Sequence, residues 1–375
     1  MTETILVINA GSSSVKFSLY ERQPDLPLLA SGEIADIGNT PSFTASARAV
    51  KTSDILPTTS THEDALRYII GWIEKQKHGA IAIAAHRVVH GGTKFTESVV
   101  VTPAVIQQLR TLTPLAPLHQ PHNLAAIDIL SKLKPGMPQI ACFDTAFHAG
   151  HTPLFSLYAV PQNLTDKGIR RYGFYGLSYE WIAHVLRQNH AVLAKGRVIA
   201  AHLGGGAGLC AMKDGVSIDT TMGMTAVEGL PMGTRCGSLD PGAVIFMIRD
   251  LNISPDDTER ILYNDCGLKG LSGLTSDVKH LEVSADPKAK LALDFFSLKV
   301  AQYVGMMAVA VGGMDALIFT GGIGEHAAGV RQRVLELLAF MKPFETLVIP
   351  ANEEGIMARH ALLLMQGTSR KRKAS

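Results

Sequence analysis

Cysteine is scarce in this sequence, and the cysteines present are not paired. The 375 residues include only Cys142, Cys210, Cys236 and Cys266, and no two of them form a Cys-x-x-Cys motif. This spacing argues against a disulfide framework and against a cysteine-based zinc site. A reducing compartment fits such a pattern, and we expect the protein to be cytoplasmic.

An excess of one charge sign is also missing. The chain has 35 Lys and Arg residues against 33 Asp and Glu residues, a formal net charge of +2. Proteins that bind nucleic acids or membrane surfaces usually carry a stronger basic bias, so we expect neither partner. The basic cluster from Arg370 to Lys373 is interpreted as a solvated chain end rather than an interaction tail.

Long apolar runs are lacking too. The stretch from Val300 to Met314 is interrupted by Gln302 and by glycines, and it is shorter than the about 20 residues that span a bilayer. It is interpreted as the end of a buried helix. The first residues lack the basic segment of a signal peptide and lead directly into an expected strand. With 46% hydrophobic and 18% charged residues, the chain can form well-buried cores, and its length favours two domains.

Two similar hairpin patterns lie about half the chain apart. Strands are expected at 5–8 and 15–20 around the turn Asn9 to Ser14, and again at 198–201 and 209–212 around Gly204 to Gly208, with a further strand at 216–218. A repeat of this kind predicts two duplicated α/β domains that face each other across a cleft.

Other segments predict core helices and buried strands. Apolar residues share one helical face at Ile106 and Leu109, and again at Leu124, Ile127, Leu130 and Leu133. Buried strands are expected at 81–85 and 139–143, ending at Arg87 and Asp144. Asp286 and Pro287 predict the start of a helix that runs to about Val311, followed by a strand at 316–320 and a third glycine turn, Gly321 to Glu325.

The three glycine turns suggest phosphate binding. Small residues let several backbone N–H groups approach phosphate oxygens together. No turn has the P-loop pattern, and Gly204 to Gly208 lacks the Rossmann spacing. Each turn alone is more simply a tight turn, but three in matching strand contexts favour a phosphate site.

Several polar residues beside these turns could take part in phosphate chemistry. Arg87 and Arg235 have planar guanidinium groups that suit carboxylates and phosphates, although an isolated arginine more often forms a surface ion pair. Asp144 and Glu353 could coordinate Mg²⁺ or assist proton movement, or be structural. Asn9, Ser12, Ser14 and Lys16 cluster at the first turn, where turn capping is the alternative reading.

Collinear motifs over nearly the whole chain resemble the acetate kinase family, within the superfamily of sugar kinases, Hsp70 and actin. The resemblance rests on segments at Val7 to Ser14, His86 to Gly92, Phe143 to His148, Arg171 to Phe174, His202 to Gly206, Glu228 to Arg235, Phe319 to Glu325 and Ile349 to Glu354. It implies reversible, magnesium-dependent phosphoryl transfer between ATP and acetate, giving acetyl phosphate and ADP, with Mn²⁺ as an alternative ion.

The resemblance also implies a fold and an assembly. We expect an α/β protein of two duplicated actin-like (ribonuclease H-like) domains with a central active-site cleft. The N-terminal domain would comprise residues 1–148 and about 354–375, and the nucleotide-binding domain residues 149–353. A homodimer is expected.

Residue roles follow from the same resemblance. Asn9 and Glu353 would hold the metal ion, Arg87 the carboxylate, and Asp144, Arg235 and Tyr175 would be catalytic. The nucleotide would be bound by Lys16, Ser12, Ser14, His202, Leu203, Gly204, Gly205, Gly206, Asp277, Val278, Lys279, Gly322, Ile323, Gly324, Glu325 and His326.

The sequence departs from the family pattern at four positions. Tyr175 replaces a histidine that stabilises the transition state, and a phenol carries no positive charge at neutral pH. Lys279 replaces an arginine, Gly205 an asparagine, and Ala226 a proline that lines the acceptor pocket. The alternatives are a kinase that prefers propionate or uses pyrophosphate, and a catalytically weakened nucleotide-binding switch. The glycines at 321, 322 and 324 leave room for adenosine and so disfavour pyrophosphate.

Overall fold

The computed structural model describes residues 2–48 and 50–373, with side chains described up to Gln366. The side chains of the basic cluster Arg370 to Lys373 therefore lie outside the described part. The chain divides into two compact units, Met1–Ala146 with Asn352–Ser375, and Phe147–Ala351.

The first unit is built on a mixed sheet whose strands follow the order β5-β4-β3-β2-β1-β6-β8-β7. Strands β1 to β5 form an antiparallel series, whereas β1, β6 and β8 run parallel and β7 pairs antiparallel with β8. The strands are β1 Glu3–Ala10, β2 Val15–Glu21, β3 Leu28–Ala35, β4 Ser42–Ala47, β5 Val50–Ile55, β6 Ala80–Val88, β7 Val99–Val100 and β8 Gln139–Phe143. The strands expected at 5–8, 15–20, 81–85 and 139–143 are thereby confirmed.

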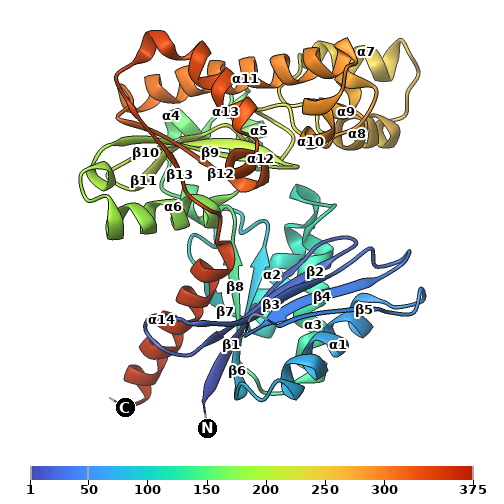
Figure 1. Cartoon of the computed structure of the whole chain (residues 1–375), viewed down its shortest axis with the longest axis vertical. Helices are drawn as coiled ribbons and strands as arrows, with labels where there is room; N and C mark the ends of the chain where they lie inside the picture. Colours follow the sequence, from blue (N-terminus) through green and yellow to red (C-terminus); the bar gives the residue numbers. More distant parts are fainter. Residues whose placement is uncertain (1, 49, 374–375) are drawn as a thin grey trace. The chain divides into compact units, whose positions relative to one another are not determined.

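Helices cover both faces of this sheet (Figure 1). Along β1, Leu6 and Ile8 join the core beneath α1 (His62–Lys75) and α3 (Gln120–Leu133). Because side chains alternate along a strand, the equally buried Ile5 and Val7 point to the opposite face, where α14 (Glu353–Lys373) packs on β1 and β6. A further helix, α2 (Pro103–Thr111), packs on α3. The predicted core positions Ile106, Leu109, Leu124, Ile127 and Leu130 are buried, and Leu133 is half-buried.

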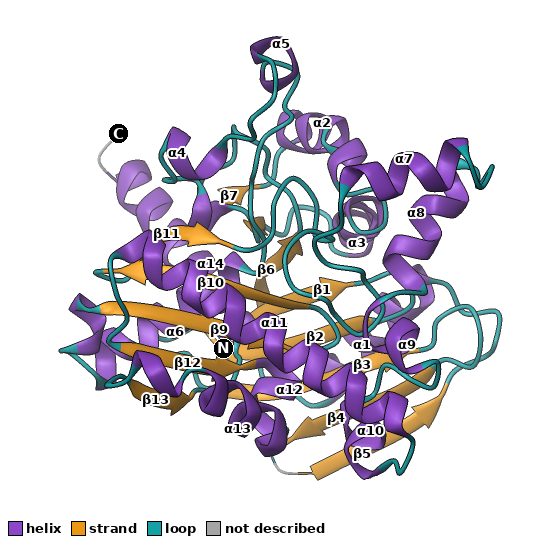
Figure 2. Cartoon of the chain, turned by 90° about the horizontal axis from the view of Figure 1, so that it is seen from above, coloured by secondary structure: helices purple, strands orange, loops and turns teal. Residues whose placement is uncertain are grey.

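The second unit has a smaller sheet with the strand order β11-β10-β9-β12-β13 (Figure 2). Its strands are β9 Arg197–Leu203, β10 Ala207–Lys213, β11 Val216–Thr220, β12 Ala316–Thr320 and β13 Glu345–Val348. The first three pair antiparallel, and β9, β12 and β13 run parallel. The same arrangement occurs in β3-β2-β1-β6-β8, so the predicted duplication is present in the topology.

Two helices sandwich the second sheet (Figure 1). Helix α6 (Gly176–Asn189) packs on one face through Tyr179, Ile182 and Leu186, and α11 (Pro287–Val311) packs along β10 and β9. The other helices are α4 Pro153–Ser156, α5 Gln162–Thr165, α7 Pro241–Arg249, α8 Pro255–Asn264, α9 Gly267–Ser272, α10 Val278–Val283, α12 Gly321–His326 and α13 Ala328–Leu337. Short 3₁₀ helices lie at Thr113–Leu115, Ala146–His148, Leu193–Lys195 and Ala339–Met341.

Helix α11 begins and ends as its sequence predicts. The Asp286 carboxylate accepts a hydrogen bond from the Lys288 N–H, and Gly312 ends the helix at a φ of 76°. By length and composition alone α11 could cross a membrane. In this fold, however, its buried residues pack against the sheet and against α9 and α13. Val309 near its C-terminus is exposed, so the expected burial of this helix end is only partial.

Two expectations need correction. Gly321 to Glu325 is not an open turn but the first turn of α12, since the segment follows β12 directly and continues helically to His326.

The boundaries between the two units also differ from the expected domain boundaries. His148 belongs to the second unit, where its ring bonds Ser217 and the Phe174 carbonyl, and Glu353 belongs to the first, because it starts α14.

Candidate active site

In the first unit, Arg87 and Asp144 form a buried ion pair at the carboxyl ends of parallel strands β6 and β8. Arg87 Nε donates to both carboxylate oxygens of Asp144, at 3.0 and 3.1 Å, and Nη2 donates at 2.6 Å. The Asp144 side chain is only 2% exposed, whereas Arg87 is 24% exposed. Strand pairing and sheet position bring together two groups that lie 57 residues apart, as expected for the ligand end of a parallel sheet.

Asn9 lies beside this pair at the end of β1. The third guanidinium nitrogen, Arg87 Nη1, is 3.5 Å from Asn9 Oδ1. The turn that follows is closed by a hydrogen bond of 2.8 Å from the Gly11 N–H to the Ser14 carbonyl. Asn123 joins the ends of β1 and β6, because its amide donates to the Ala10 carbonyl and accepts from the Val89 N–H.

The remaining polar residues of this turn are accessible to a ligand. Ser12 is exposed and Ser14 is half-buried. The Lys16 ammonium is 57% exposed and lies 3.9 Å from the Glu33 carboxylate, a contact too long and too solvated to hold it firmly. Lys16, Glu33 and Glu354 also line a groove of about 370 Å³ along β2 and β3.

Glu353, the first residue of α14, has an electrostatic environment that suits a cation. Burial is the main effect on the pKa of Glu353 and raises it, and the negative charge of Asp144 also raises it. A hydrogen bond from the Glu353 backbone N–H and the positive charge of Arg87 lower the same pKa. Two carboxylates that repel each other beside one guanidinium are stabilised by added positive charge. Among the described residues no group of three or more Asp, Glu, His or Cys side chains could hold a metal ion. The chemistry of Glu353 beside Asp144 is compatible with Mg²⁺, which needs only one or two protein carboxylates when phosphates supply further oxygens.

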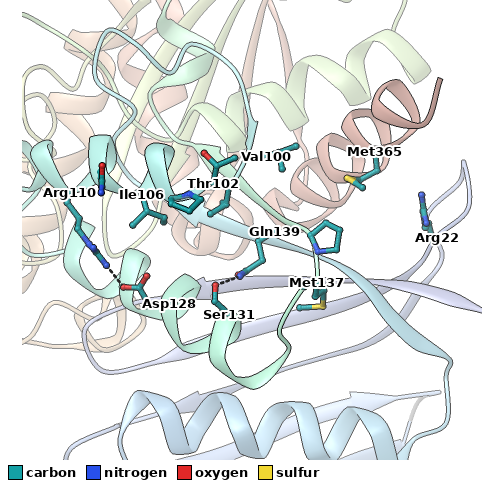
Figure 3. A pocket seen from close by; sticks show the side chains of 15 residues that line it. Arg22, Val100, Thr102, Ile106, Arg110, Asp128, Ser131, Met137, Gln139 and Met365 are labelled. Atoms are coloured by element: carbon teal, nitrogen blue, oxygen red, sulfur yellow. Dashed lines mark hydrogen bonds and ion pairs between the residues drawn. The ribbon is translucent and has the colours of Figure 1, made fainter. Parts of the chain in front are cut away.

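The first unit also has a larger pocket, whose lining includes none of these residues. Figure 3 shows the side chains that line it. It has a volume of about 1000 Å³ and is lined by β7, the N-terminus of α2, the segment before β8, and Met365 of α14. On its wall, Arg110 pairs with Asp128 at 2.7 Å and the Gln139 amide nitrogen donates to Ser131 at 2.8 Å, whereas Gln139 Oε1 is buried without a hydrogen-bond partner among the described residues. Gln139 starts β8 whereas Asp144 follows its end, so this pocket lies at the opposite end of the strand.

In the second unit, three glycine-containing segments converge. The β9–β10 turn is closed by a hydrogen bond of 2.8 Å from the Gly204 N–H to the Gly206 carbonyl, and Gly205 accepts one of 3.0 Å from the Gly233 N–H. A Cβ on Gly321 would lie 2.7 Å from the Leu203 carbonyl oxygen, so α12 starts directly against the end of β9. Gly322 is also close to this turn, since a Cβ on Gly204 would lie 3.8 Å from the Gly322 backbone nitrogen. Backbone N–H groups gathered in this way can donate to phosphate oxygens.

Tyr175 lies over this glycine turn. It precedes α6 in the left-handed conformation, with a φ of 58°, and its ring stacks on His202 at a centroid distance of 4.3 Å. His202 is in turn bonded to Ser178 at 2.8 Å. A Cβ on Gly206 would be 1.9 Å from the Tyr175 hydroxyl and 3.6 Å from Arg235 Nη1. Tyr175, Gly206 and Arg235 are thus neighbours, and an unusual backbone conformation at such a point is typical of functional sites.

The Arg235 side chain is half-buried and contacts neutral groups. Its Nη1 donates to the Ala226 carbonyl at 3.2 Å, and its guanidinium carbon lies 6.0 Å from the Tyr263 ring centroid. Both of these partners are neutral groups, which suits a guanidinium that binds an anionic ligand.

The other predicted nucleotide residues fall into two groups. Asp277 caps α10 by accepting from the Lys279 N–H at 2.9 Å, while the Lys279 side chain is exposed and Val278 is buried. Glu325 has a structural role, since its carboxylate accepts hydrogen bonds from the Gly321 and Ala351 N–H groups at 3.0 and 2.9 Å. His326 is exposed at the end of α12, and Ile323 is half-buried within it.

Sequence reasoning missed the polar residues that support these groups. Asn123 lies in the helix for which only the apolar face was predicted, and Tyr158 lies in none of the recognised motifs. Arg171 and Glu228 fall inside matched motifs but were given no role, although Tyr158 donates to Glu228 and Arg171 lies 3.9 Å from it.

Comparisons with known proteins agree with this geometry. The family model described as the acetokinase family matches residues 4–357. An acetate kinase of Rhodopseudomonas palustris is 44% identical over 397 aligned residues, covering 98% of this chain and 100% of that one. Crystal structures of a Porphyromonas gingivalis acetate kinase and a Francisella tularensis propionate kinase are each 33% identical, with TM-scores of 0.87 and 0.91. The first comparison covers 97% of this chain and 100% of that one, and the second 96% and 98%. The chain therefore belongs to the acetokinase family.

Proposed function

We propose that this chain is an acetate kinase that reversibly transfers the γ-phosphoryl group of ATP to acetate. The observation that carries the proposal is the set of charged and glycine residues in a protein of this family: the Arg87–Asp144 pair in one unit, and Arg235 beside the Gly204 to Gly206 turn in the other. Phosphoryl transfer depends on positioning and charge neutralisation rather than on covalent chemistry with the protein, and these residues supply both.

In the proposed reaction an acetate oxygen forms a bond to the γ-phosphorus while the bond to the β–γ bridging oxygen breaks. The bonding electron pair leaves with ADP. Acetate is already an anion at neutral pH, so no general base has to deprotonate it. We therefore assign Asp144 to orienting the Arg87 guanidinium, which binds the acetate carboxylate. The backbone of the glycine turn and Arg235 would bind the phosphate oxygens, with Tyr175 donating a neutral hydrogen bond.

Asn9 and Glu353 are proposed to hold Mg²⁺, or Mn²⁺ in its place. The ion, when bound, would neutralise charge on the nucleotide phosphates. Lys16, Ser12 and Ser14 would contact the same phosphates from the first turn. His202, Leu203, Asp277, Val278, Lys279 and the segment Gly322 to His326 would border the nucleotide.

A propionate-preferring kinase is the second candidate. The Francisella tularensis neighbour is described as a propionate kinase. Ala226 stands where the resemblance implies a proline that lines the acceptor pocket, and the Ala226 carbonyl accepts a hydrogen bond from Arg235. One CH₂ group in an apolar pocket is worth about 0.8 kcal/mol, so propionate should approach acetate in kcat/KM.

A weakened nucleotide-binding switch is the candidate from another class, motivated by Tyr175. It is disfavoured by the intact Arg87–Asp144 pair, because a protein that only binds nucleotide needs no acceptor arginine.

Capture of acetyl phosphate with hydroxylamine, in the presence of ATP, Mg²⁺ and acetate, tests the proposal directly. We expect acetohydroxamate to form in proportion to the enzyme concentration, and an Arg235→Ala variant to form far less. Nucleotide binding without any acetohydroxamate at high enzyme concentration would favour the switch.

We also propose that the protein is a cytoplasmic homodimer. Support for the dimer comes from α7, an apolar helix of the second unit with Asp240 as its N-cap and with none of its residues buried. Exposed apolar surface of this extent on a helix is typical of a protein interface.

A further inference from the structure

A polar cluster in the second unit holds the loop between β11 and the Glu228 to Arg235 segment. The Gly223 carbonyl of this loop accepts hydrogen bonds from the Tyr172 and Gly173 N–H groups, at 3.0 and 3.2 Å. One residue later, the Met224 N–H donates to the Tyr158 hydroxyl at 3.0 Å. The first half of the loop is therefore fixed by groups from the segment before α6.

The second half of the loop is fixed by Glu228. The Tyr158 hydroxyl donates to Glu228 Oε2, and Arg171 Nη1 lies 3.9 Å from Oε1. Arg171 also pairs with Asp219 at 3.4 Å and donates to the Thr220 carbonyl. We call Tyr158, Arg171, Asp219 and Glu228 the loop clamp.

The loop clamp is tightly packed and largely shielded from water. The side chains of Arg171, Asp219 and Glu228 are 19%, 12% and 31% exposed. A Cβ on Gly223 would lie 1.6 Å from Glu228 Oε2 and 2.0 Å from the Tyr158 hydroxyl, so the loop backbone lies directly on the clamp. Hydrogen bonds to charged groups in such surroundings are stronger than at an open surface.

Ala226 lies midway between the two fixed points, Met224 and Glu228, and its carbonyl accepts the hydrogen bond from Arg235 Nη1 at 3.2 Å. We propose that the loop clamp is a set of positioning residues that aims the Arg235 guanidinium through the Ala226 carbonyl. This inference rests on the proposed function, in which Arg235 binds the transferring phosphoryl group. A small displacement of such a group lowers the rate without weakening ground-state binding, because its contact matters most in the transition state.

Tyr158→Phe is the direct test, since it removes the bond to Glu228 and the acceptor for the Met224 N–H while keeping the ring. We expect kcat to fall about tenfold, with the KM values for ATP and acetate within about twofold of the parent. Tyr68→Phe is the matched control. It also removes a phenol–carboxylate hydrogen bond, the 2.6 Å bond from Tyr68 to Asp54, but this bond joins α1 to the edge strand β5 of the first unit. Its kcat should not change.

A double-mutant cycle with Arg235→Lys separates positioning from general stability. If the clamp acts through the Arg235 guanidinium, Tyr158→Phe should lower kcat by less than about twofold in the Arg235→Lys background. Glu228→Gln keeps the shape of the side chain and should show the same loss of kcat. It replaces Tyr158→Phe as the test variant if Tyr158→Phe does not fold.

Equal fractional losses in both backgrounds, or no loss of kcat in Tyr158→Phe, would overturn the inference while leaving an active parent kinase. A parent with no kinase activity would instead overturn the proposed function, and this inference with it.

Discussion

Among single residues, Tyr175 offers the most direct test of the proposed mechanism. Its hydroxyl lies against Gly206 and near Arg235, and its ring stacks on His202. Because the phenol carries no positive charge at neutral pH, it can offer the phosphoryl oxygens only a neutral hydrogen bond. The stacking on His202 holds the ring in place, so the position itself is well defined even though the donor is weak.

We predict that Tyr175→His raises kcat about tenfold or more, with little change in either KM. A charged or stronger donor stabilises mainly the transition state, and a preorganised donor is worth roughly 10² to 10³ in rate when it is removed completely. Tyr175→Phe keeps the aromatic ring and should lower kcat. Steady-state kinetics with ATP and acetate measure both effects. If both variants match the parent in kcat, position 175 does not stabilise the transition state in this enzyme.

Arg87 is the second test at the residue scale. Arg87→Ala should raise the acetate KM strongly while sparing ATP binding, but it also leaves Asp144 buried without its partner, a change that typically costs about 3 to 5 kcal/mol of stability. Arg87→Lys keeps the charge and loses the bidentate geometry, so we expect a rise of about tenfold in the acetate KM in a folded protein. An unchanged acetate KM in the folded Lys variant would contradict the assignment.

At the scale of elements, α7 differs from the other helices in having an apolar sequence without buried residues. Ile245 and Phe246 are 49% and 53% exposed, and Leu251 just beyond the helix is 55% exposed. Burying this surface against a second copy would remove apolar area from water at about 25 cal/mol per Å².

We therefore predict that Phe246→Glu shifts the protein from dimer to monomer, measured by light scattering after size exclusion. Phe340→Glu is the matched control, because Phe340 is 84% exposed in the same unit but lies in a short 3₁₀ helix away from α7 in sequence. Loss of the dimer in both variants would mean that the effect is not specific to α7. A Phe246→Glu variant that remains dimeric would place the interface elsewhere.

At the scale of the whole molecule, buried histidines in both units link stability to pH. Burial lowers the pKa of His86 and of His90 to about 4 in the first unit, and that of His148 to about 3 in the second. Burial also lowers the pKa of His151 to about 4. In the unfolded chain these rings titrate near about 6.5, so between about pH 6.5 and about pH 4 the unfolded state binds more protons. The stability contributed by the neutral rings is present above about pH 6.5 and is lost as the pH falls.

We expect the melting temperature to fall markedly between about pH 7 and about pH 5, since each such proton changes the unfolding free energy by about 1.4 kcal/mol per pH unit. Replacing the fully buried His86 by Leu should make the melting temperature less dependent on pH. An equal pH dependence in the parent and in His86→Leu would contradict the assignment to His86.

Much of the fold could be predicted because its helices and strands depend on local sequence patterns. The hairpins around Asn9 to Ser14 and Gly204 to Gly206, the helix that starts at Pro287, and the strands that end at Arg87 and Asp144 each depend on neighbouring residues. Alternating or helical hydrophobic spacing and capping residues determine such elements within a few turns of chain. The family motifs supplied the reaction and the residue roles, which the structure places in two groups.

Only the tertiary structure decided which of these residues meet. Residues far apart in sequence meet in the bidentate pairing of Arg87 with Asp144, in the contact of Tyr175 with Gly206, and in the loop clamp. Glu353 likewise belongs to the first unit although it lies near the end of the chain. Such contacts depend on strand order and on how the returning helix α14 packs. Local periodicity carries no information about either, because the same apolar face can pack against any complementary surface.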